Sequence, residues 1–365
     1  MIRLPRGAER WVPGLVGSWL RDSGWRASPG SQPTVWLHFT DHFEPLGGGA
    51  TQAQALERVS RWQRHWPRIA QSVPDSFGRS AQFTFFYPAE EDEPEVVERI
   101  ASIVRQGVGD IEVHYHHDQD TDANFRTVVG TFVRRLREEH GLLRVNEAGA
   151  IQWCFIHGNW ALDNSHPEGR WCGLNNELTL LRELGCRADF TLPSAPSGCQ
   201  TSLVNAIYWA EDDPTKPKSH DRGTLVRAGV APPPDALLMV QGPLTVRQHE
   251  RYRVLPTLEV GELAGYALPT MARARSWLRA APRIGNHIFL KLFGHGAQER
   301  NGAPLLEGGG LQRCLEMTRT ACEERGYRVG YLTAWEVTRL IEDLSAGRCA
   351  PDGMPEWLPA LAGSR

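Results

Sequence analysis

The sequence predicts an α/β protein, a β/α barrel of seven or eight units. Short apolar runs alternate with amphipathic helical stretches along most of the 365 residues. This alternation is typical of βα units that build a largely parallel sheet. Polar residues gather where the predicted strands end, and β/α barrels place their active sites at such ends. A chain of this length is sufficient to bury a sizeable core.

The elements follow from apolar periodicity, with period 2 for strands and 3.6 for helices. The predicted strands are 34–39, 82–87, 111–116, 151–156, 188–192, 287–292 and 329–333. The predicted helices are 53–69, 95–106, 123–139, 175–184, 270–280, 311–325 and 334–344. Gly185 follows one of these helices where a C-cap glycine is expected. The stretch 193–260 is rich in Pro and Gly, and 236–240 is its best strand candidate.

Three segments are expected from this pattern. Residues 1–30 form an N-terminal amphipathic extension, 31–345 the barrel and 346–365 a C-terminal tail. Apolar residues of the extension recur near helical spacing, at Trp11, Leu15, Trp19 and Leu20. Packing against the barrel is the expected role of this face, and contact with a partner or a membrane surface is the alternative.

The composition and charge of the chain indicate which classes of partner to expect. The chain is 41% hydrophobic and 23% charged, with a formal net charge of -3, which does not favour nucleic acid or an anionic membrane as a partner. No apolar run reaches the roughly 20 residues of a spanning helix, so no integral membrane segment is expected. The N-terminus lacks the apolar core and cleavage site of a signal peptide, which favours a cytoplasmic protein. The oligomeric state stays open.

The cysteines fit a reducing compartment. There are seven, an odd number, and no CxxC pair occurs. A disulfide framework and a zinc knuckle are therefore not expected, and buried reduced thiols are.

Four clusters of ionisable or polar residues stand at predicted strand ends. They are the segments 39–45, 114–122, 157–164 and 291–296. The second contains His114, His116, His117 and Asp118, and such imidazole and carboxylate groups suit zinc, cobalt, nickel or iron. A solvated polar loop with one or two core histidines is the structural alternative.

The other clusters supply further candidates. The first contains Asp41 and Glu44, which can bind a metal or transfer a proton, and His42, which the metal could also recruit. In the third, Asn159 and Asp163 offer sugar hydrogen bonds, or else form Asx turns that hold a loop. Trp160 can stack on a sugar ring or fill the core. His295 lies between two glycines, which leaves room for a ligand.

The order of these motifs resembles the NodB-type polysaccharide deacetylases, carbohydrate esterase family four. That family has a strand ending in Thr-Phe-Asp-Asp-Gly, and this chain has His38-Phe39-Thr40-Asp41-His42. The family motif Glu-Ile-Gly-Asn-His-Thr-x-x-His runs parallel to 110–118, so that His114 and Asp118 match its two metal ligands. A closing Leu-x-His motif is similar to 289–295. The resemblance covers about residues 33–345 by motif order.

Two positions depart from the family pattern. Thr40 stands where the family has its catalytic base, and Asp41 where it has a metal ligand. His157 replaces the arginine that orients the base, and it joins Asn159, Trp160 and Asp163 as an expected substrate-binding residue.

The resemblance implies a divalent metal, zinc above all, with cobalt, nickel or iron as alternatives. The expected ligands are Asp41, His114, His116 and Asp118. The expected catalytic residues are Asp41 or Glu44 as base and His295 as acid.

The expected activity is hydrolysis of an N- or O-linked acetyl group on a saccharide substrate. Two alternatives stay open: a non-catalytic carbohydrate-binding barrel, and a glycoside hydrolase-like enzyme on the same fold, which would use paired carboxylates.

Overall fold

The computed structural model describes residues 8–248 and 256–358. Parts of the predicted extension, the Pro/Gly-rich stretch and the tail, namely 1–7, 249–255 and 359–365, lie outside the described residues. The helices are α1 (Ala8–Ser23), α2 (Gln52–Ser72), α3 (Pro94–Val104), α4 (Asp122–Glu138), α5 (Glu177–Glu183), α6 (Met271–Ala280), α7 (Glu299–Leu305), α8 (Gly310–Glu323) and α9 (Ala334–Ser345).

The strands agree with the predicted alternation and add several short ones. They are β1 (Thr34–His42), β2 (Phe83–Pro88), β3 (Gly109–Tyr115), β4 (Arg144–Val145), β5 (Ile151–His157), β6 (Cys186–Asp189), β7 (Ile207–Ala210), β8 (Thr224–Leu225), β9 (Leu237–Val240), β10 (Thr245–Gln248), β11 (Pro256–Glu259), β12 (Glu262–Leu263), β13 (Arg283–Ile284), β14 (His287–Gly294) and β15 (Arg328–Tyr331).

The main sheet is mostly parallel and mixed at its margin. Its order is β12-β14-β1-β2-β3-β5-β6-β9-β7-β8, and the pairs from β12 to β9 along this path are parallel. β7 pairs antiparallel with both β9 and β8. The expected α/β class with a parallel-rich sheet is therefore confirmed. Within the described residues no strand pair joins β12 to β8, so the strand pairing does not establish a closed barrel or its number of units.

The sheet nevertheless curves strongly on itself. Lys291 on β14 is fully buried and its Nζ donates to the carbonyl oxygens of Phe190 and Leu192, the latter at 2.6 Å. Those carbonyls follow β6, which is five places from β14 in the sheet order. A flat sheet would hold these strands far apart, since neighbouring strands are about 4.8 Å from each other.

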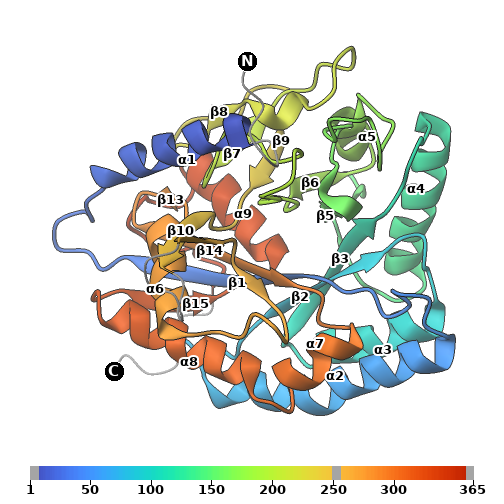
Figure 1. Cartoon of the computed structure of the whole chain (residues 1–365), viewed down its shortest axis with the longest axis horizontal. Coiled ribbons are helices and arrows are strands. Elements are labelled where there is room, and N and C mark those ends of the chain that lie inside the picture. Colours follow the sequence, from blue (N-terminus) through green and yellow to red (C-terminus); the bar gives the residue numbers. More distant parts are fainter. Residues whose placement is uncertain (1–7, 249–255, 359–365) are drawn as a thin grey trace.

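Helices cover the outer face of this curved sheet. Along β1, Leu37, Phe39 and Phe43 pack with Trp62 and Trp66 of α2 in the larger core cluster. In Figure 1, α2, α3 and α4 lie along the lower and right side of the molecule, outside β1, β2 and β3. The opposite face of β1 carries a second cluster with α9, which includes Trp36 and Phe289. β1 is thus buried on both faces, as its uninterrupted burial shows.

The N-terminal helix α1 packs by one edge only. Trp11 and Leu15 are buried with Val204 and Leu244, whereas Leu20 is 71% exposed. In Figure 1 this helix lies beside β7 and β8. Within the described ranges, no helix combines the length and apolar character needed for a membrane span. All seven cysteines are free and buried.

Candidate functional site

Side chains from the carboxyl ends of β1, β3 and β14 meet at one end of the sheet. His42 is the last residue of β1, and Glu44 follows two positions later. His114 lies near the end of β3 and His116 directly after it. His295 comes directly after β14. Since these strands are parallel, their carboxyl ends share one edge, where α/β proteins assemble reactive groups.

Glu44 lies at the centre of this group. Its Oε1 is 3.2 Å from Nε2 of His114 and 3.2 Å from Nε2 of His116, and the two nitrogens are 3.3 Å apart. His42, Glu44 and His114 are buried and offer ligand atoms within 4.8 Å of one another. Ligands around one zinc ion are separated by roughly 3–4 Å, given its bond lengths of about 2.0–2.3 Å. We term His42, Glu44, His114 and His116 the histidine cluster.

The outer nitrogen of two of these rings already has a partner. Nδ1 of His114 is 2.9 Å from the carbonyl oxygen of Ile156, and Nδ1 of His116 is 2.5 Å from Oε1 of Glu90. Both oxygens only accept hydrogen bonds, so each Nδ1 carries a proton. In the neutral rings, two Nε2 lone pairs therefore converge on the Glu44 carboxylate. This arrangement requires a cation, and such outer partners are typical of metal-binding histidines.

The electrostatics agree with a cation site. Burial raises the pKa of Glu44, but hydrogen bonds with His114 and His116 hold it well below its usual range. Burial lowers the pKa of His116, yet its bonds to Glu44 and Glu90 raise it to about 10. Burial, with repulsion from His114, holds the pKa of His42 well below its ordinary value. A proton on His116 can supply the cation, and a divalent ion would replace that proton.

Three further aromatic rings contact His42 on the side of the histidine cluster where His295 is partly exposed. His295 is half-buried and stacks on it, with ring centroids 4.9 Å apart and planes at 22°. Phe293 and Trp160 lie 6.3 and 6.5 Å away, edge-on. Burial lowers the pKa of His295. A partly exposed, mainly neutral imidazole at this position can exchange a proton with a bound substrate.

Asp41 faces away from the histidine cluster. Successive side chains of a strand point to opposite faces, and Phe39 and Phe43, two residues on either side of Asp41, lie in the helix-side core. Its carboxylate oxygens both accept from the backbone N–H of Gly296, at 2.8 and 2.9 Å. Burial raises the pKa of Asp41 to about 8. The structure thus does not bring Asp41, expected as a ligand and base, to His114 and His116, and His42 lies beside His114 instead.

Asp118 and Asn159 are also outside the cluster. Asp118 is exposed and its Oδ1 accepts from the backbone N–H of Trp171 at 2.7 Å, because the chain turns outward after His117. Asn159 is exposed on the loop that follows β5. Of the expected ligands, His114 and His116 lie together, and Asp118 does not join them.

The remaining expected residues belong to a second, fully buried group. His157 lies beside His117, with ring centroids 4.7 Å apart, and both contact Glu177. Cys172 completes a set of four ligand atoms within 4.8 Å of one another. We term His117, His157, Cys172 and Glu177 the closed cluster. The backbone N–H of Asp163 donates to Glu177 at 2.6 Å, so Asp163 supports this cluster and is not open to a substrate.

The comparisons with known proteins find similarity to solved structures and to no sequence family. No protein family and no curated protein matches the sequence. Among solved structures, a 4-alpha-glucanotransferase from Thermococcus litoralis is similar with a TM-score of 0.41 and 10% identity. The similarity covers 84% of this chain and 40% of that enzyme, so this chain spans less than half of its length.

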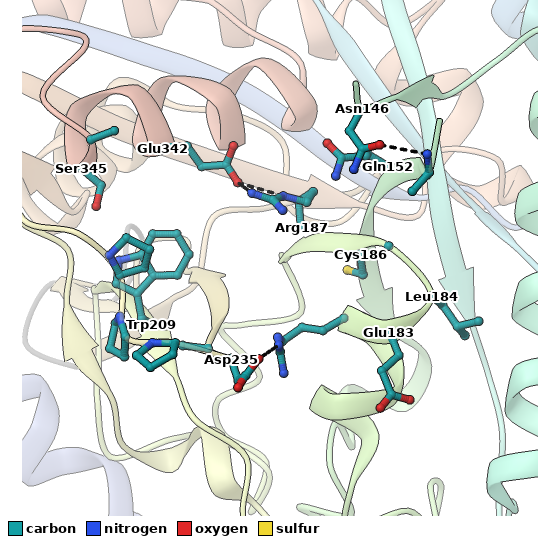
Figure 2. A pocket seen from close by; sticks show the side chains of 18 of the residues that line it. Asn146, Gln152, Glu183, Leu184, Cys186, Arg187, Trp209, Asp235, Glu342 and Ser345 are labelled. Atoms are coloured by element: carbon teal, nitrogen blue, oxygen red, sulfur yellow. Dashed lines mark hydrogen bonds and ion pairs between the residues drawn. The ribbon is translucent and has the colours of Figure 1, made fainter. Parts of the chain in front are cut away.

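One cavity lies at the other end of the sheet. Its volume is about 700 Å³, and the beginnings of β5 and β6 and the end of α9 line it. Figure 2 shows ion pairs on its wall, Arg187 with Glu342 and Arg182 with Asp235. The residues that line it include none of the histidines. We therefore place the candidate chemistry at the histidine cluster.

Several site residues were absent from the sequence-based site. Cys172, Glu177 and Glu90 belong to or contact the two clusters, and none was assigned a role. His117 was named only among the possible metal-binding groups of the segment 114–122. His42 was named only as an extra ligand. Phe39 and Phe43 flank Asp41 at a spacing of two, but β1 is buried on both faces, so this period alone does not assign Asp41 to the helix-side core.

Proposed function

We propose that this chain is a metal-dependent hydrolase that removes an N- or O-linked acetyl group from a carbohydrate. The observation that carries the proposal is the convergence of the His114 and His116 lone pairs on the Glu44 carboxylate. A divalent ion held there supplies a Lewis acid for an acyl carbonyl and lowers the pKa of a water molecule. Three imidazoles and one carboxylate fit zinc, and cobalt, nickel and iron accept the same donors.

The charge of the cluster suits this chemistry. His42, His114 and His116 are neutral ligands when their rings bind a metal, and Glu44 carries one negative charge. A divalent ion among them keeps an uncompensated positive charge, which strengthens its attraction for a carbonyl oxygen. Nε2 of Gln298 donates to Oε2 of Glu44 at 3.2 Å, and this contact orients the carboxylate.

His295 is the proposed general acid. Its ring stacks on His42 at the partly exposed side of the cluster, where a leaving nitrogen or oxygen would emerge. As a mainly neutral imidazole it would take a proton from the attacking water and then deliver that proton to the leaving group. Glu44 is occupied by the histidines and Gln298, so it acts as a ligand in this proposal and not as the base.

The loop after β5 carries side chains that suit a saccharide substrate. Trp160 is half-buried beside the cluster, and Trp171 is 36% exposed on the same loop. Flat aromatic faces pack well against the apolar faces of sugar rings, and the exposed amide of Asn159 can bond a hydroxyl. The choice of an acetyl group as the group that is removed rests on the order of the sequence motifs, which resembles that of the NodB-type deacetylases.

Acetate release tests the proposal. Purified protein would be stripped with a chelator, reloaded with zinc or cobalt, and incubated with N- and O-acetylated oligosaccharides. We expect acetate from the loaded protein, none from the stripped protein, and none from His114→Ala. His140→Ala is a matched control. His140 follows the end of α4 that is remote from His116, and it contacts the exposed Glu98. Acetate release that survives metal removal would overturn the proposal, as would saccharide binding without turnover.

Glycoside hydrolysis is the second candidate. Glu44 and Glu90 contact the two nitrogens of His116, at 3.2 and 2.5 Å, so two carboxylates stand on either side of one imidazole. Inverting glycosidases hold their carboxylates roughly 6.5–9.5 Å apart, with a water molecule between them. New reducing ends without acetate, formed equally well by the metal-free protein, would favour this candidate.

A further inference from the structure

The closed cluster brings four possible ligand atoms within 4.8 Å of one another, a spacing that one metal ion can bridge. Oε1 of Glu177 is 3.2 Å from Nε2 of His117 and 3.7 Å from Nε2 of His157. Oε2 of Glu177 is 3.3 Å from Sγ of Cys172. Around a zinc ion with bonds of about 2.0–2.3 Å, neighbouring ligand atoms are separated by roughly 3.3–3.8 Å. The four donors thus stand close to the corners that one ion would need.

The tautomer of His157 indicates that a cation lies beside its ring. Its Nδ1 contacts the carbonyl oxygen of Gly158, which only accepts, so Nδ1 carries the proton. Its Nε2 is then a lone pair, completely buried, with no hydrogen-bond partner. That lone pair faces the Glu177 carboxylate across 3.7 Å. Two buried acceptors that face each other are costly unless a positive charge lies between them.

The surroundings of Cys172 fit a thiolate. The backbone N–H groups of Asn164 and Leu174 donate to its Sγ, at 3.2 and 3.4 Å. A neutral thiol is a weak acceptor, whereas a metal-bound thiolate is regularly stabilised by donors of this kind. Sγ also lies 3.3 Å from Oε2 of Glu177, where a neutral thiol donates to the carboxylate, and a bound cation would take the place of that proton.

Charge and exposure separate the closed cluster from the histidine cluster. Two neutral imidazoles, one thiolate and one carboxylate balance a divalent ion completely. All four side chains are buried, and Tyr115 stacks on His117 at 4.7 Å while Phe125 packs 5.5 Å from the same ring. A neutral four-ligand site closed by aromatic rings leaves no position for substrate, which is the mark of a structural zinc.

We infer that His117, His157, Cys172 and Glu177 bind a structural zinc ion that fastens the loop between β5 and α5 to the sheet. His117 follows β3, His157 ends β5, Cys172 lies within the loop and Glu177 begins α5. Thiolate and imidazole donors with one carboxylate favour zinc among the available divalent ions. Asp120 Oδ2, 3.2 Å from Nδ1 of His117, orients that ring.

The loop needs such an anchor. Residues 158–176 contain only one short 3-10 turn, Gly158–Trp160, and several non-glycine residues with positive φ, including Asp163 at 53° and Trp171 at 68°. Backbone of this kind persists only where the surroundings hold it. The loop also touches the histidine cluster, because a Cβ at Gly158 would meet the His116 ring at 2.4 Å. The inferred zinc therefore holds one wall of the candidate active site, although the inference does not depend on the proposed activity.

Cobalt spectroscopy on the full chain tests this site separately. A cobalt(II) ion bound by a thiolate gains a charge-transfer band in the near ultraviolet, and the histidine cluster contains no sulfur. We expect the cobalt-loaded wild type to show this band, Cys172→Ser to lose it together with one bound equivalent of metal, and His114→Ala to retain it. Cys199→Ser, a buried cysteine outside both clusters, is the matched control and should retain the band.

The wild-type spectrum decides the case even if a variant fails to fold. A wild-type protein that binds cobalt without a thiolate band overturns the inference, as does one that binds no metal. A band that survives in folded Cys172→Ser overturns it as well. Loss of the band in His114→Ala but not in Cys172→Ser would assign the metal to the other cluster and contradict the inference. Thermal unfolding with and without a chelator should show a lower midpoint for the stripped wild type.

Discussion

Nε2 of His114 and Oε1 of Glu44 lie 3.2 Å apart, and neither atom carries a proton when the His114 ring is neutral. The carbonyl of Ile156 fixes this protonation from the far side of the ring. With that ring neutral, the pair therefore needs a shared cation, either a proton on one of the neighbouring rings or a metal ion. The predictions about the candidate site follow from this relationship.

Glu90 should strengthen metal binding without touching the metal. Its Oε1, 2.5 Å from Nδ1 of His116, holds that ring so that Nε2 points at Glu44. We expect Glu90→Gln to weaken zinc binding at the histidine cluster by about 10–100-fold, the usual effect of removing an outer partner. A competition titration with a chromophoric chelator measures this. Glu95→Gln, on an exposed face of α3, should leave the affinity unchanged.

His295 should affect turnover and not metal content. We expect His295→Gln to lower kcat by about 10²–10⁴-fold, the range for loss of a general acid. Metal analysis and kinetics on the same preparation separate the two roles. Loss of the metal together with His295 would show that this ring is a ligand, which the account does not predict.

A half-buried arginine should be important for stability. Arg144 pairs with Asp110 and with the fully buried Glu112, both on β3, and its guanidinium stacks over Trp335 at 4.6 Å. Arg144→Met leaves two carboxylates without their partner, and we expect a loss of about 3–5 kcal/mol in the free energy of unfolding. Urea denaturation measures it. In the exposed pair with Asp235, Arg182→Met should cost less than about 1 kcal/mol.

A second buried pair should give a pH-dependent stability. Burial raises the pKa of Glu259, but two bonds from Arg273 at 2.8 Å and one from Trp277 at 2.8 Å hold it below its ordinary value. Its contribution is therefore complete above the unfolded pKa of about 4.3 and is lost as the pH falls through the lower folded value.

Glu259→Gln should remove this dependence of stability on pH. We expect a loss of about 3–5 kcal/mol at pH 7, because Arg273 is left buried without its counter-charge. The difference from wild type should shrink below about pH 4. Denaturation at a series of pH values checks it, and a pH-independent difference would contradict the assigned charge state. Glu324→Gln, in a solvent-exposed pair with Arg275, is the control and should change little at any pH.

The fold could be predicted from local periodicity to a large extent. Each long strand and helix that was predicted has a counterpart, because apolar repeats and C-cap glycines such as Gly185 are local signals. β7 and β8 were missed, since their short antiparallel pairing depends on contacts with β9 that are far apart in the sequence. Closure of the sheet is also a tertiary property, and alternation alone does not fix it.

The site was harder to predict for two physical reasons. β1 is buried on both faces, so neither Asp41 nor His42 is marked as the inward residue, and a shift of one position exchanges their faces. The closed cluster joins His117 to Glu177 across 60 positions without a spacing motif. That His114, His116, Glu44 and His295 lie at one end of the sheet could be predicted, because each lies within two residues of the end of a strand whose position was clear.

Zinc binding by Cys172→Ser, with and without His114→Ala, tests the central claim most directly. Removing the closed cluster's sulfur leaves the histidine cluster as the expected metal site. The account predicts one equivalent of tightly bound zinc in Cys172→Ser. That equivalent should disappear when His114→Ala is added. A folded Cys172→Ser protein that binds no zinc, or that keeps its zinc after His114→Ala, would contradict the assignment of the histidine cluster as the metal centre.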